Sequence, residues 1–122
     1  MTVTHKFIVI GLLFLATLAT GFWRSKAGQA AFPGIHKLLA LTWIVYTGLA
    51  IYHAGRPVEG RAALIAAIAV LALSMAALIV TGSLLTMPQH LNAATLNTHR
   101  MAAAVAAIAA GVTARLLLSN MR

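Results

Sequence analysis

Four long apolar segments, separated by short polar stretches, constrain the fold of this chain more than any other feature. Apolar runs of about 18 or more residues with few charges are typical of membrane-spanning helices. Short connections between such helices favour antiparallel neighbours. The sequence therefore predicts an all-α, integral membrane four-helix bundle with up-down-up-down topology, built from two repeated helical hairpins. We expect residues 1–122 to form a single transmembrane domain, with spans at about 7–23, 35–54, 61–85 and 93–119.

The composition agrees with a membrane protein and argues against other classes. Of the 122 residues, 61% are hydrophobic and 8% are charged, whereas a soluble domain of this size must present a more polar surface. The formal net charge is +8, but the basic residues are scattered at the ends of the apolar runs, close to where lipid headgroups lie. A nucleic-acid-binding surface would cluster them on one face. We therefore expect a lipid bilayer around the chain and no nucleic acid partner.

Three further absences narrow the function. The chain has no cysteine, which excludes disulfides, iron–sulfur clusters and haem attached through cysteine. Its single acidic residue, Glu59, lies in a connection, so no carboxylate inside a span supports a proton pump. No nucleophile–base arrangement indicates an enzyme with its own substrate chemistry.

Helix-breaking and capping residues mark the limits of the segments. Pro33-Gly34 introduces the second span, residues 55–60 separate the second from the third, and Pro88 closes the third. The first apolar run has the look of a signal peptide, and we count it as a span. The fourth span has three alternative N-caps, which are Asn92, Thr95 and Asn97.

A histidine–cation pair recurs at the same place in both halves of the chain, as His36-Lys37 and His99-Arg100. Each pair stands near the start of an apolar segment and follows a Thr-Gly that ends the previous segment. Each histidine is followed by Ala four residues later and by Gly twelve residues later. These flanking residues are Thr20-Gly21, Ala40 and Gly48 in the first half, and Thr81-Gly82, Ala103 and Gly111 in the second.

We interpret His36 and His99 as the two axial ligands of one iron. Titratable side chains within membrane spans are costly and indicate function by default; the alternative is that both are ordinary interfacial residues. In the predicted bundle the second and fourth helices run parallel and lie on a diagonal of about 14 Å. Each Nε2 reaches roughly 6 Å from its helix axis, which leaves space for an iron bound at about 2 Å on each side.

One haem b fits this pair better than a bare metal ion does. Zinc and copper sites usually need three or four protein ligands, whereas a porphyrin supplies four nitrogens itself. The alanines near the histidines leave room for a flat macrocycle, although alanine-rich helices also pack closely without a ligand. These alanines are Ala40, Ala102, Ala103, Ala106, Ala107 and Ala110.

Lys37 and Arg100 are placed to bind the haem propionates, or else serve as interfacial anchors. Arg24 and Lys26, in the predicted loop on the same side, add positive charge there. Trp43 lies two helical turns after His36. Three environments are open for its side chain: it packs against the porphyrin, lines the bundle or faces lipid.

A second haem at His53 is not expected. The residue that matches His53 in the second half is Leu116, and His53 lies about 100° around the helix from His36. Its one other partner on that side would be His5, near the N-terminus. His90, in the connection before the fourth span, is expected to be solvated.

The pattern of Thr-Gly at the end of one helix and His-[Lys/Arg]-x-x-Ala at the start of the next resembles the four-helix bis-histidine core of bacterial b-type membrane cytochromes. This type includes the membrane cytochrome subunits of hydrogenases and formate dehydrogenases. The resemblance extends from about Thr20 to Arg115 and rests on few residues. It implies haem b, electron exchange with quinone or a redox partner protein, and a bacterial inner membrane location.

The sequence thus predicts an electron-transfer protein with one low-spin haem b near one membrane surface. Two alternatives stay open: a cofactor-free membrane subunit or assembly factor of a larger complex, and a haem-based redox sensor. The basic residues are divided almost evenly between the two sides, and we expect cytoplasmic termini.

Overall fold

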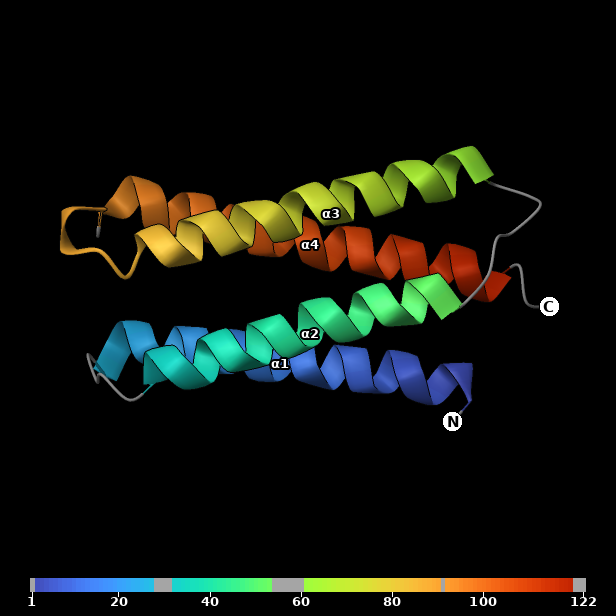
Figure 1. Cartoon of the computed structure of the whole chain (residues 1–122), viewed down its shortest axis with the longest axis horizontal. Coiled ribbons are helices and arrows are strands. Elements are labelled where there is room, and N and C mark those ends of the chain that lie inside the picture. Colours follow the sequence, from blue (N-terminus) through green and yellow to red (C-terminus); the bar gives the residue numbers. More distant parts are fainter. Residues whose placement is uncertain (1, 28–31, 54–60, 91, 120–122) are drawn as a thin grey trace. The chain divides into compact units, whose positions relative to one another are not determined.

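The computed structural model describes residues 2–27, 32–53, 61–90 and 92–119. Nearly all of them are helical, and no strand occurs within these ranges. Figure 1 shows the helices along the chain. They are α1 (Val3–Ala27), α2 (Phe32–His53), α3 (Arg61–Leu84) and α4 (Ala93–Ser119), with a short 3₁₀ helix, Pro88–His90, before α4. The all-α prediction is confirmed.

The helices form two hairpins. α1 packs along α2, and α3 packs along α4 (Figure 1). The chain divides into two compact units, Met1–Gly55 and Arg56–Arg122, with one hairpin in each. The predicted organisation as two repeated helical hairpins is confirmed.

All four helices are long and apolar enough to cross a membrane. The candidate spans are Thr4–Gly21, Ile35–His53, Arg61–Leu84 and Ala93–Ser119. Large apolar side chains on these helices remain exposed in the structure, among them Leu38 at 67%, Leu73 at 72% and Ile108 at 69%. Extended apolar exteriors of this kind are rare in soluble proteins but match the hydrocarbon of a bilayer.

Apolar and hydroxyl side chains are buried in the α1–α2 hairpin. Ile10 and Thr17 of α1 and Trp43 and Thr47 of α2 are buried. The Trp43 ring lies against Phe14, with ring centroids 4.9 Å apart. Since His36 precedes Trp43 by seven residues, or two turns, both side chains lie on the same face of α2.

Small side chains fill much of the α3–α4 hairpin. Ala106, Ala109 and Thr113 are buried on α4, and Leu71 and Ser74 are buried on α3. Small residues let helix backbones approach closely in lipid, where water provides no force that drives helices together. The buried hydroxyls donate to carbonyl oxygens of their own helix, for example Thr113 to Ala109 at 2.7 Å, so these hydroxyls are satisfied without water.

One helix end differs from the sequence expectation, and at another the structure selects one of the predicted alternatives. α1 continues to Ala27, so Arg24 and Lys26 belong to the helix and not to a loop, because the backbone can stay helical after the apolar run has ended. α4 is capped by Asn92, whose Oδ1 accepts a hydrogen bond from the Thr95 backbone N–H at 2.9 Å. Among the three alternative caps, Asn92 is therefore the correct one. The breaker at 55–60 lies outside the described residues.

Candidate functional site

His36 is held against α1 by two oxygen atoms. It lies in the first two turns of α2 and is half-buried. Its Nδ1 is 2.9 Å from the Thr17 carbonyl oxygen and 3.2 Å from Thr20 Oγ1. Thr17 and Thr20 lie one turn apart on α1, near the end of its candidate span, so the imidazole sits close to one end of the apolar zone.

His99 occupies the matching place in the second hairpin. It is half-buried in the second turn of α4, and its Nδ1 is 2.7 Å from Thr81 Oγ1 on α3. Thr81 is itself buried, with 8% of its surface exposed. In both hairpins, therefore, a histidine of the second helix makes a contact through Nδ1 with a threonine in the last turns of the first.

The glycine after each threonine leaves room for the imidazole ring. A Cβ placed on Gly21 would lie 2.8 Å from Cε1 of His36, closer than carbon atoms tolerate without movement. A Cβ on Gly82 would lie 3.4 Å from Cε1 of His99, which is ordinary contact. Each ring edge thus stands against the backbone of the preceding helix, more tightly in the first hairpin.

The sequence pattern located the Thr-Gly pairs but did not assign them a role. In the sequence they mark only where a segment ends, whereas in the structure they contact the histidines. A signal for this contact was present: in an antiparallel hairpin with a short connection, the last turns of one helix lie beside the first turns of the next. Thr20 and His36 are 16 residues apart, and Thr81 and His99 are 18 apart.

The other predicted site residues occupy equivalent positions beside the two histidines. Ala40 and Ala103 are half-buried and lie one turn after their histidine on the same helix face. Lys37 and Arg100 are exposed. His36, Lys37 and Ala40 belong to the first unit, and His99, Arg100 and Ala103 belong to the second. The structure therefore brings the predicted site residues together within each hairpin, as two sets of three.

The remaining histidines make local contacts. His53 Nδ1 donates to the Leu49 carbonyl oxygen at 2.8 Å, within its own helix, and the ring meets Tyr52 edge-on. His5 Nδ1 contacts the Thr2 hydroxyl. His90 is exposed in the 3₁₀ helix. The interhelical threonine contact thus distinguishes His36 and His99 from these three.

Trp43 is 2% exposed, so the alternative in which it faces lipid is wrong. It packs against Phe14 within the first hairpin. Its Nε1 and the Thr47 Oγ1, one turn further on, are buried polar atoms for which the described part of the structure offers no hydrogen-bond partner.

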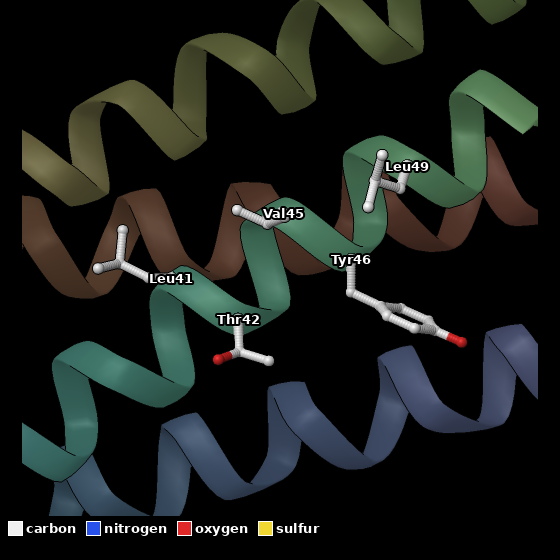
Figure 2. Close-up of a pocket in the computed structure, with 5 residues that line it drawn as sticks. All are labelled: Leu41, Thr42, Val45, Tyr46 and Leu49. Atoms are coloured by element: carbon white, nitrogen blue, oxygen red, sulfur yellow. The ribbon is translucent and has the colours of Figure 1, made fainter.

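A shallow apolar groove of about 340 Å³ runs along α2 beyond the histidine, as Figure 2 shows. Leu41, Val45 and Leu49, which line it, are each more than half exposed. Thr42 and Tyr46 complete its lining, and Figure 2 shows both side chains on the flank nearer α1. None of the predicted site residues lines this groove, and we regard it as part of the apolar exterior.

Within the described ranges, no three histidine or carboxylate side chains gather where they would hold a metal ion. The chain matches no family model, no curated protein and no solved structure. Its description therefore rests on its own residues: a four-helix protein of two hairpins with four candidate membrane spans and one repeated histidine contact.

Proposed function

We propose that this chain is an integral, multi-pass membrane electron-transfer protein that binds one low-spin haem b through His36 and His99. The observation that carries the proposal is the repeated contact: in both hairpins a half-buried imidazole is held through Nδ1 by the threonine of the preceding helix. The proposal includes an up-down-up-down bundle in which the second and fourth helices provide one ligand each.

Ordinary interfacial histidines do not account well for this arrangement. A snorkelling side chain extends toward the headgroups and water. His36 instead packs so closely on α1 that Gly21 has no room for a Cβ, and Thr17 and Thr20 are both within hydrogen-bond distance of its Nδ1. Polar groups kept inside a span, twice and in the same surroundings, point to a ligand function.

The residues near each histidine suit a haem. Alanine one turn away, at Ala40 and Ala103, takes little space beside the ring. Lys37 and Arg100 are exposed next to the histidines, where cations would pair with propionates. Held by His36 and His99, a haem would supply one-electron transfer.

The sequence resemblance to bacterial b-type membrane cytochromes supports the same proposal. It suggests a bacterial inner membrane location and a quinone or a redox protein as the partner. The proposal also places both termini in the cytoplasm. Because both histidines lie near the ends of candidate spans, electrons would be exchanged at one membrane surface. A hydrocarbon core of about 30 Å separates that surface from the other, so transport across it would require further cofactors in a larger complex.

An absorption spectrum tests the proposal. The purified wild-type protein should show a Soret band and, after reduction, a sharp α-band. His36→Ala and His99→Ala should each abolish these bands or weaken haem binding severely, because a six-coordinate low-spin haem needs both imidazoles.

His53→Ala is the matched control, since His53 is also a histidine of α2 but makes its contact within its own helix. Its spectrum should equal that of the wild type. A wild-type protein without a Soret band would contradict the proposal and favour the cofactor-free membrane subunit. Loss of haem from His53→Ala alone would show that the ligand assignment is wrong.

A further inference from the structure

The hydrogen-bonding direction at His99 follows from the threonine. A hydroxyl group has one hydrogen to donate. Thr81 Oγ1 lies 2.6 Å from the carbonyl oxygen of Ala77, which can only accept, so the hydroxyl hydrogen is engaged there. The hydroxyl oxygen is then an acceptor for the 2.7 Å contact with His99 Nδ1, which favours a donor N–H on that nitrogen.

The same result holds for His36, on different evidence. Its Nδ1 is 2.9 Å from the Thr17 carbonyl oxygen, which cannot donate. The Thr20 hydroxyl lies 3.0 Å from the carbonyl oxygens of both Ala16 and Thr17, so its hydrogen is also engaged within α1. Its oxygen, 3.2 Å from His36 Nδ1, is a second acceptor for the same N–H.

A proton on Nδ1 determines the chemistry of the other ring nitrogen. In a neutral imidazole with Nδ1–H, the lone pair is on Nε2, and Nε2 is then the atom that can bind a metal. An acceptor on Nδ1–H also fixes the ring orientation and raises the basicity of the ligand. Histidines that bind metals in proteins almost always have such a partner.

We propose that Thr20 and Thr81 are positioning residues, which hold His36 and His99 in the Nδ1–H tautomer with Nε2 as the ligand atom. Gly21 completes the arrangement at His36, because its missing side chain lets the ring approach the backbone of α1, whereas a Cβ would still fit at Gly82. The role of Nε2 as a ligand atom rests on the proposed haem function, but the tautomer itself is a property of the chain alone.

The two halves differ in how much the hydroxyl contributes. At His99 the threonine oxygen is close, at 2.7 Å. At His36 it is 3.2 Å away, and the Thr17 carbonyl oxygen is nearer. A side-chain substitution leaves that carbonyl in place, so Thr81→Val should have a larger effect than Thr20→Val.

Nitrogen-15 NMR of the full chain, histidine-labelled and free of haem in a lipid environment, measures the tautomers directly. His36→Gln and His99→Gln assign the two ring signals. In the wild type both rings should show a protonated Nδ1 and an unprotonated Nε2. If either ring carries its proton on Nε2 instead, the proposal is overturned, whether or not any variant folds.

Thr81→Val should raise the Nε2–H population of His99 in the haem-free protein. In the haem-loaded protein it should weaken haem binding roughly tenfold, since loss of such a partner typically costs about 10–100-fold in affinity. Thr81→Ser should restore both properties because it keeps the hydroxyl. Unchanged His99 signals in a folded Thr81→Val protein would refute the positioning role.

One control variant separates positioning from general packing. Thr113→Val removes a buried hydroxyl of the same hairpin that donates to Ala109. It should leave the tautomers unchanged; a shift equal to that of Thr81→Val would contradict the proposal. A wild type with the expected tautomers but no haem band would refute the haem function and leave the positioning inference standing.

Discussion

At the scale of single residues, the two halves of the repeat are similar but not equal. The His36 ring is so close to α1 that a Cβ on Gly21 would meet Cε1 at 2.8 Å, whereas the corresponding distance at Gly82 is 3.4 Å. His36 also has a carbonyl oxygen at 2.9 Å in addition to the threonine. The first hairpin therefore confines its histidine more tightly than the second does.

This difference predicts unequal effects of the same substitution. Gly21→Ala should destabilise the protein by about 1–3 kcal/mol, because the added methyl group forces the His36 ring out of its position. Gly82→Ala should be close to neutral or slightly stabilising, since its Cβ fits and alanine favours a helix interior by up to about 1 kcal/mol. Thermal and denaturant unfolding in detergent measures both values. Equal free energies of unfolding for the two variants would contradict the prediction.

The sequence predicted the histidines of the site but not their contacts. His36 and His99 stand out because they recur with the same neighbours in both halves. The contact with Thr20 and Thr81 depends on how each helix is rotated about its axis and how closely the pair packs. A repeated motif contains neither quantity, because it gives the spacing along one helix and not the face that meets the next.

At the scale of helices, capping residues predicted the helix ends better than hydropathy did. Asn92 precedes α4 and caps it, as one of three alternatives had suggested. Hydropathy placed the first segment at 7–23, but α1 extends from Val3 to Ala27 because polar and charged residues are also compatible with helical backbone. The apolar run thus indicates where a bilayer would lie, and the helix continues beyond it.

The cap at α4 gives a prediction at this scale. Asn92→Ala should lower the free energy of unfolding by about 1 kcal/mol, because the Thr95 N–H loses its acceptor. Asn97→Ala is the matched control: Asn97 is exposed within α4, where alanine is the better helix former. Thermal unfolding followed by circular dichroism measures the difference. A larger loss from Asn97→Ala than from Asn92→Ala would show that the cap does not stabilise the helix.

At the scale of the whole molecule, four candidate spans imply an order in which the chain crosses the membrane. With an even number of crossings, Thr2 and Ser119 should lie on one side. Gln89, exposed between α3 and α4, should lie on the other.

This order is testable by labelling because the chain has no cysteine of its own. In intact cells, a membrane-impermeant maleimide should give the same result for Thr2→Cys and Ser119→Cys, which are either both labelled or both unlabelled. Gln89→Cys should give the opposite result. Disrupted membranes, in which all three variants should react, serve as the control. Labelling of Thr2→Cys and Gln89→Cys from the same side would refute the four-span topology.

The histidine contacts described above have a consequence for biogenesis. The partners of His36 and of His99 lie only 16 to 19 residues away along the chain, within the same hairpin. The first contact can therefore form as soon as residues 1–55 have left the ribosome and inserted, while the second half is still being synthesised. Each half can then orient its own imidazole within the membrane, independently of the other half.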